Sequence, residues 1–123
     1  MKKVVKFGGS SLADANQMRK VAQIVHSDES RRYVVPSAPG KRFSDDVKVT
    51  DMLYGCYDAA ARGEDISGRM NAIQARFREI IEGLELSLDL SEEFRLIEDL
   101  FKRQAGRDYA ASRGEYLNGI VLA

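Results

Sequence analysis

The order of a short strand, a glycine pair, a helix and a second strand near the start of the chain constrains its fold most. Lys3 to Phe7 is rich in β-branched residues and predicts a strand, which the two glycines after it end. Asp14, with Gln17 three residues later, predicts the start of a helix. Apolar residues at helical spacing extend this helix to about Ser27. Tyr33 to Val35 predicts a second strand. Together they form a βαβ unit, so we expect a parallel pair joined by a right-handed crossover.

The rest of the chain predicts helices. A loop containing Pro39 and Gly40 follows the second strand, and four stretches with apolar residues at helical spacing come after it. The third stretch is expected to begin with Ser91 as its N-cap, and the fourth with Asp108. We therefore expect an α/β fold with a short parallel sheet and mostly helices after residue 49, in a single domain. The stretches are Val49–Ala60, Ile66 to near Gly83, Ser91–Gly106 and Asp108–Val121.

Charge and cysteine content exclude several classes of function. The 19 basic and 19 acidic residues cancel, so no broad field is present to hold nucleic acid or an anionic membrane. Cys56 is the only cysteine, which excludes an internal disulfide and favours a buried, inert thiol. With His26 as the only histidine, neither a Ser-His-Asp nor a Cys-His mechanism has partner residues. The apolar run at the start is too short for a signal peptide, so we expect a cytoplasmic location.

The first candidate site is the segment Lys6-Phe7-Gly8-Gly9-Ser10-Ser11, where a strand ends and a helix is expected. Gly8 and Gly9 let the backbone approach an anion without a Cβ in the way, and their N–H groups can form an anion-binding nest. Ser10 can donate a hydrogen bond, and Lys6 supplies a full charge for a transferring phosphoryl group. The alternative is a tight turn between strand and helix with a solvated lysine.

The second candidate is the loop Ser37-Ala38-Pro39-Gly40-Lys41. It leaves the second strand at the same end of the sheet as the first candidate, and ligands of open parallel sheets bind beyond that end. We therefore expect the two loops to lie side by side. By itself, Pro39-Gly40 is simply a turn.

Two further candidates lie on predicted helices. Thr50, at the head of the second helix, is either a site residue or an N-cap. Gly114 costs about 1 kcal/mol against alanine inside a helix, which indicates the close approach of another group. Glu115 is three residues from Ser112 and shares its helical face, the alternative being a solvated glutamate.

Together these four segments resemble the aspartate kinases of the amino-acid kinase superfamily, and the resemblance runs from Lys3 to Ala123. It implies the N-terminal portion of the three-layer αβα amino-acid kinase fold. One departure is Pro36, which stands where many members keep an apolar residue or serine. The matching segments are the opening signature Lys6–Ser11, the second-strand loop Val34–Lys41, the segment Lys48–Asp51 and the Ser-x-Gly-Glu element Ser112–Glu115.

The resemblance implies ATP-dependent phosphorylation of the side-chain carboxylate of L-aspartate to 4-phospho-L-aspartate, the first step toward lysine, threonine and methionine. ATP with Mg²⁺ is the implied co-substrate, and no residue of the chain is assigned to a metal. Lys6 is the implied catalytic residue, stabilising the transferring phosphoryl group. The other implied roles are phosphate binding by Lys6, Gly8, Gly9 and Ser10, lining of the site by Ser37, and aspartate binding by Thr50 and Glu115, with Glu115 taking the ammonium group.

Ala123 follows an apolar run with no Gly, no Pro and no basic last turn, so we expect a chain cut short, an incomplete kinase domain over residues 1–123. Such a chain is expected to be inactive alone. It is also expected to self-associate, as a homo-oligomer, through an open sheet edge and uncovered helix faces. Two alternatives stay open: an amino-acid kinase acting on glutamate, acetylglutamate or a nucleotide, and a non-catalytic fragment or module that regulates a full kinase.

Overall fold

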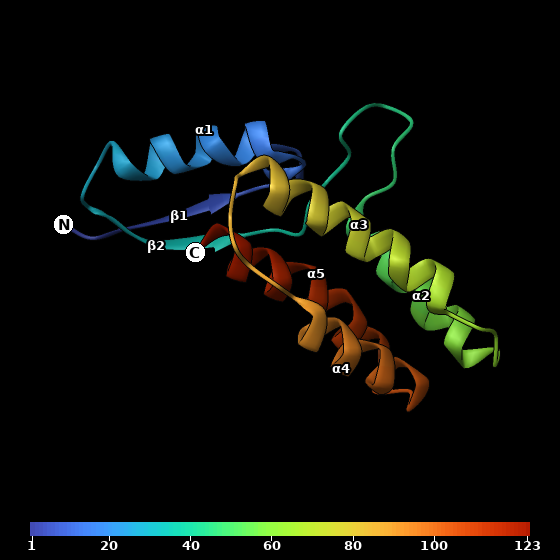
Figure 1. Cartoon of the computed structure of the whole chain (residues 1–123). Helices are drawn as coiled ribbons and strands as arrows, with labels where there is room; N and C mark the ends of the chain where they lie inside the picture. Colours follow the sequence, from blue (N-terminus) through green and yellow to red (C-terminus); the bar gives the residue numbers. More distant parts are fainter.

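The structure, a computed structural model, describes residues 1–123 and confirms the expected α/β fold. Two parallel strands are followed by a run of helices, and Figure 1 shows these later helices packed together beside the sheet. The elements in chain order are β1 (Lys3–Phe7), the 3-10 helix η1 (Gly9–Leu12), α1 (Ala15–His26), β2 (Arg31–Pro36), α2 (Val49–Ala61), α3 (Ser67–Gly83), α4 (Ser91–Lys102) and α5 (Arg107–Leu122). No helix is long and apolar enough to cross a bilayer.

The two strands present different surroundings on their two faces, because side chains alternate along a strand. Val34 and Pro36 line a hollow together with residues of α1 and α5, so these helices lie on that face. The opposite face, here called the open face, carries Val4 and Lys6 on β1 and Tyr33 and Val35 on β2. Val4 is 68% exposed, Tyr33 53% and Val35 48%, so no helix of the chain covers this face. The chain therefore holds two of the three layers of an αβα arrangement.

Of the N-cap residues predicted from the sequence, only Asp14 is confirmed. The Asp14 carboxylate accepts a hydrogen bond from the Gln17 backbone N–H at 2.9 Å, which confirms Asp14 as the N-cap of α1. The N-caps expected at Ser91 and Asp108 are wrong: Leu90 and Gly106 occupy those positions. Ser91 is instead the first helical residue, and its N–H and hydroxyl both donate to the carboxylate of Asp89.

One contiguous core joins the four later helices. It contains 22 buried residues, and α2 is central because it contacts α3, α4 and α5. Tyr57 on α2 and Phe101 on α4 meet edge to face, with ring centroids 5.5 Å apart. Cys56 is fully buried beside them, which confirms the sequence prediction for its burial.

Candidate functional site

The loop Ser37–Gly40 lies beside the glycine segment that follows β1, as predicted from the topology. The Ser37 N–H donates to the Phe7 carbonyl oxygen at 3.1 Å, and the Gly40 N–H donates to the Gly9 carbonyl oxygen at 2.8 Å. The first of these bonds continues the strand pairing one residue beyond β2. The second joins the two candidate loops directly through their backbones.

Gly9 and Gly40 make the closest approach between the two loops. A Cβ on Gly40 would lie 2.6 Å from the Gly9 carbonyl carbon and 2.8 Å from the Ser10 nitrogen, both of them backbone atoms. A Cβ on Gly9 would lie 3.1 Å from the Ala38 carbonyl oxygen. The two loops can therefore touch only because both residues are glycine. Gly8 is different, because a Cβ there would meet nothing within 4 Å.

The other two candidate segments also meet the Ser37–Gly40 loop. The Val49 N–H, at the start of α2, donates to the Pro39 carbonyl oxygen at 3.1 Å. On α5, a Cβ at Gly114 would lie 2.6 Å from the Cβ of Ala38, which confirms the close approach that this helical glycine indicated. The other three segments singled out in the sequence thus converge on this one short loop.

The side chains of Lys6, Thr50 and Glu115 have no hydrogen-bond or ion-pair partner within the chain, whereas that of Ser112 is hydrogen-bonded. Lys6 lies on the open face and forms no ion pair, and neither does the exposed Glu115. Thr50 is the second residue of α2, whose N-cap is Lys48 without a side-chain cap bond, so Thr50 does not cap this helix. Ser112 turns back to its own helix, donating to the Tyr109 carbonyl oxygen at 2.7 Å. Free charges and hydroxyls of this kind are available to a ligand.

The helix predicted to begin with Asp14 as its N-cap does begin there, and a short 3-10 helix lies between the glycine pair and that start. The 3-10 helix η1 occupies Gly9–Leu12, and α1 starts at Ala15 under its own cap. The physical reason is the carboxylate of Asp14, which already satisfies an N–H group at the start of α1. The glycine segment is therefore separated from the start of α1 by the residues of η1.

Two residues that the sequence pattern did not single out hold the loops in place. Asn118 on α5 is fully buried, and its Nδ2 donates to the Ser37 carbonyl oxygen at 2.7 Å, while its Oδ1 has no partner. Arg76 on α3 is 5% exposed and donates to three backbone carbonyl oxygens. Asparagine and arginine within a helix are ordinary surface residues by pattern, so no signal in the sequence points to either one.

Charged groups tie the segment between Gly40 and α2 to α3. Arg42 pairs with Asp46 at 2.7 Å and with Glu79 of α3 at 2.9 Å. The hydrogen bond from Arg42 holds the pKa of the Asp46 carboxyl well below its usual range. Burial lowers the pKa of the Arg76 guanidinium. The group remains a cation, because the ordinary pKa of arginine lies far above neutral pH. The net effect is a balanced cluster that fixes the loop without adding charge.

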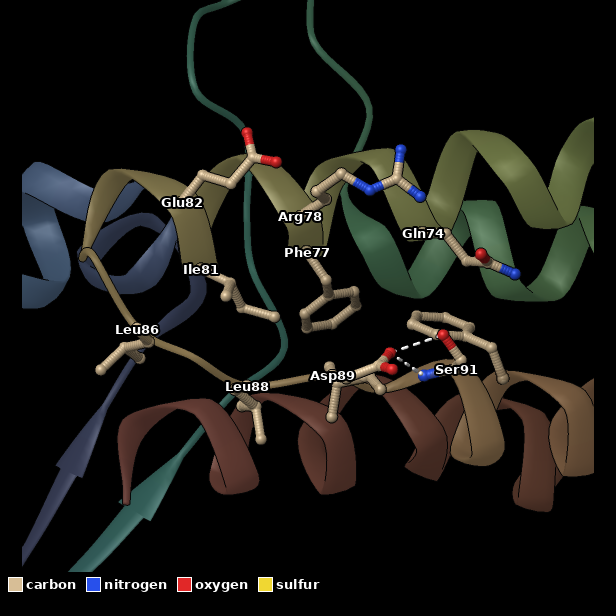
Figure 2. A pocket seen from close by; sticks show the side chains of 11 residues that line it. Gln74, Phe77, Arg78, Ile81, Glu82, Leu86, Leu88, Asp89 and Ser91 are labelled. Atoms are coloured by element: carbon tan, nitrogen blue, oxygen red, sulfur yellow. Dashed lines mark hydrogen bonds between the residues drawn. The ribbon is translucent and has the colours of Figure 1, made fainter.

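A separate hollow of about 270 Å³ lies between α3, α4 and the segment that joins them. Figure 2 shows Phe77 and Ile81 pointing into it, while Arg78 and Glu82 point away. None of the candidate residues lines this hollow or any other principal hollow of the surface. The candidate site is therefore an open surface in this chain, without an enclosed pocket.

The comparisons with known proteins agree with the geometry. The family model described as "Amino acid kinase family" matches residues 1–123. Aspartokinase 3 of Bacillus subtilis is 43% identical over 99 residues, which are 80% of this chain and 21% of that protein. Among solved structures, Clostridium acetobutylicum aspartate kinase superposes with a TM-score of 0.94 at 46% identity, over 100% of this chain and 29% of that one.

A structure of lower sequence identity matches over nearly the same length. Escherichia coli aspartokinase III, solved in complex with aspartate and ADP, superposes with a TM-score of 0.74 at 28% identity, over 99% of this chain and 28% of that one. The chain thus spans less than a third of the length of these relatives. Because a family model covers every residue and the fold matches over the whole length, the chain belongs to the amino acid kinase family.

Proposed function

We propose that this chain forms the phosphate cradle and part of the amino-acid pocket of an aspartate kinase. The proposal is supported above all by the convergence of three separate segments on the loop Ser37–Gly40. The similarity to aspartate kinases over the whole chain supports the choice of substrate. In the reaction, a carboxylate oxygen of aspartate attacks the γ-phosphorus of ATP, which enters as its magnesium complex. The new bond gives 4-phospho-L-aspartate, and the broken bond releases ADP.

Each candidate residue has a role that fits its surroundings. Lys6 is an unpaired cation at the end of β1, suited to the negative charge that gathers on a transferring phosphoryl group. Gly8, with open space at its Cβ position, lets phosphate oxygens reach the backbone. Glu115 is an unpaired carboxylate, suited to the substrate ammonium group. The chemistry is mainly positioning and charge stabilisation, which rigid loops provide.

The remaining roles are assigned from the positions of the residues along the chain. Gly9 and Ser10 continue the phosphate cradle, Ser37 begins the loop on which the segments meet, and Thr50 lies in the first turn of α2. We also propose that the chain self-associates through the open sheet edge and uncovered helix faces, and the exposed apolar side chains of the open face favour such association as well. The cytoplasmic location expected from the short apolar run at the start of the sequence stays a prediction.

A chimera tests the proposal. Residues 1–123 would replace the matched segment of the C. acetobutylicum enzyme, and ADP release would be followed with aspartate, glutamate and acetylglutamate as acceptors. We expect turnover with aspartate only. Turnover with glutamate instead would assign the chain to another amino-acid kinase, and a folded but inactive chimera would favour a non-catalytic module. The 123-residue chain alone should give background rates, because its candidate site is an open surface.

Within the active chimera, Lys6→Ala should lower kcat by about two to three orders of magnitude, the scale for losing one charge-stabilising group. The KM for aspartate should change little. Lys2→Ala is the matched control, because Lys2 is also exposed near β1 and forms no ion pair. An unchanged kcat with a raised KM for aspartate would show that Lys6 has another role.

A further inference from the structure

Arg76 is the most unusual charged residue of the chain, because it is buried in the middle of α3. Removing an arginine from water is costly unless its donors are satisfied. Arg76 is the only one of the nineteen lysines and arginines that is buried. The groups that contact Arg76 must therefore offset the cost of burying its charge.

The partners of Arg76 are backbone carbonyl oxygens of three different segments. Its Nη2 donates to Gly40 at 2.8 Å and to Ala13 at 3.4 Å, and its Nη1 donates to Val47 at 2.9 Å. Ala13 follows the glycine segment, Gly40 belongs to the second loop, and Val47 precedes α2. The Asp46 carboxylate lies 3.6 Å away and balances the charge. The planar guanidinium fork can hold several such acceptors at fixed angles.

These bonds also fix the direction in which the loop presents its donors. Every peptide bond of the chain is trans, so the carbonyl and the following N–H point in opposite directions. Because the Gly40 carbonyl is turned inward to Arg76, the Lys41 N–H is turned outward. The N–H groups of Lys41 and of Gly8 donate to no acceptor in the chain. They are the neighbours of Gly40 and Gly9, which are in direct contact.

We propose that Arg76 is a positioning residue of the phosphate cradle: it holds Gly40 against Gly9 so that the N–H groups of Gly8 and Lys41 are available to the phosphate groups of a nucleotide. The inference rests on the proposed function for the identity of the ligand. A simple contribution of Arg76 to fold stability differs from it, because that role leaves the affinity for phosphate unchanged once the protein is folded.

The test uses the 123-residue chain, with tripolyphosphate as the probe and amide signals measured by NMR. Arg76→Met keeps the length of the side chain and removes its donors. Arg78→Met is the matched control, because Arg78 lies on the same helix, is exposed and forms no ion pair. In Arg76→Met we expect local shifts at Gly9, Gly40 and Lys41, unchanged signals from α4, and affinity for tripolyphosphate lowered about tenfold or more, the scale for misplaced charge-assisted donors.

Arg76→Lys should give an intermediate affinity, because an ammonium group cannot hold three carbonyls in a fork. Added guanidinium should restore part of the affinity of Arg76→Met, and sodium chloride at equal ionic strength should not. A lower melting temperature with unchanged affinity and no shifts at Gly9 and Gly40 would overturn the proposal. If Arg76→Met does not fold, Arg76→Lys decides: wild-type affinity would refute the positioning role, and reduced affinity would support it.

The failure of the proposed function is a separate outcome. If the wild-type chain binds no tripolyphosphate, the assigned phosphate cradle is wrong for this chain. The amide signals of Gly9 and Gly40 then still decide about Arg76. Their displacement in Arg76→Met would uphold its role in holding the two loops together, and their constancy would refute it.

Discussion

Substitution of Gly40 by alanine should unfold the junction between the two loops. The new Cβ would lie 2.6 Å from the Gly9 carbonyl carbon, 2.8 Å from the Gly9 oxygen and 2.8 Å from the Ser10 nitrogen. Real Cβ atoms do not approach backbone atoms so closely, and backbone atoms cannot rotate away as a side chain can. The two loops must therefore separate, and the 2.8 Å hydrogen bond from Gly40 to Gly9 is lost with their contact.

The cost follows from these two effects. Overpacking of a tight site costs about 1–3 kcal/mol, and backbone neighbours favour the upper end. A lost backbone hydrogen bond adds about 1 kcal/mol. The free energy of unfolding should therefore fall by about 4 kcal/mol, which for a domain of this size lowers Tm by about 16 °C. Thermal and urea unfolding followed by circular dichroism measure both quantities.

Gly8→Ala is the matched control, because it adds the same methyl group to a glycine of the same site. Gly8 has φ −76° and ψ 169°, which any residue adopts, and its Cβ position is open. Its stability should stay within about 0.5 kcal/mol of the wild type, or rise slightly through the unfolded chain. A wild-type Tm for Gly40→Ala, or an equal loss in both variants, would refute the steric reasoning.

Three further predictions concern the rest of the chain. Light scattering after size exclusion should show an apparent mass that rises with concentration, because the open face is apolar; a sharp 13.8 kDa species at every dilution would exclude self-association. Because the folded pKa of Asp46 lies below its unfolded value, its pairing with Arg42 stabilises the fold above about pH 4 and is lost as the pH falls. Asp46→Asn should therefore flatten the acid side of the stability curve, and an unchanged slope would contradict this. Burial raises the pKa of the Cys56 thiol to about 11, so Ellman's reagent at pH 8 should react with it only on unfolding, and rapid labelling of the native chain would show that it is accessible.

Local patterns predicted most of the fold. The bounds of β1 match the prediction, and β2 extends beyond the predicted Tyr33–Val35 because its pairing with β1 orders the flanking residues as well. The topology rule for parallel strands correctly brought the two candidate loops together, since it depends only on strand direction. The helical glycine Gly114 correctly indicated a close contact, although its partner Ala38 was not predictable.

Long-range contacts account for what the sequence did not predict. Thr50 was a plausible cap by residue type, but a hydrogen bond from Val49 to Pro39 fixes where α2 begins. Arg76 and Asn118 reach acceptors 36 and 81 residues away along the chain. A local pattern of polar and apolar residues carries no information about such partners. The supporting residues of the site are therefore visible only in the folded chain.

The contacts of the Ser37–Gly40 loop also couple the site to α5 energetically. Gly114 and Asn118 dock that helix on the same loop that receives Gly9 and the start of α2. A ligand that orders the loop therefore also stabilises the docking of α5. Because such coupling is reciprocal, the gain in docking free energy equals the gain in ligand-binding free energy that docked α5 provides. Slower amide hydrogen exchange along α5 is then a measure of occupancy at the loop. The exchange rates of α5 therefore report ligand binding beside Gly8 and Gly9, and substitutions that loosen α5 should weaken that binding.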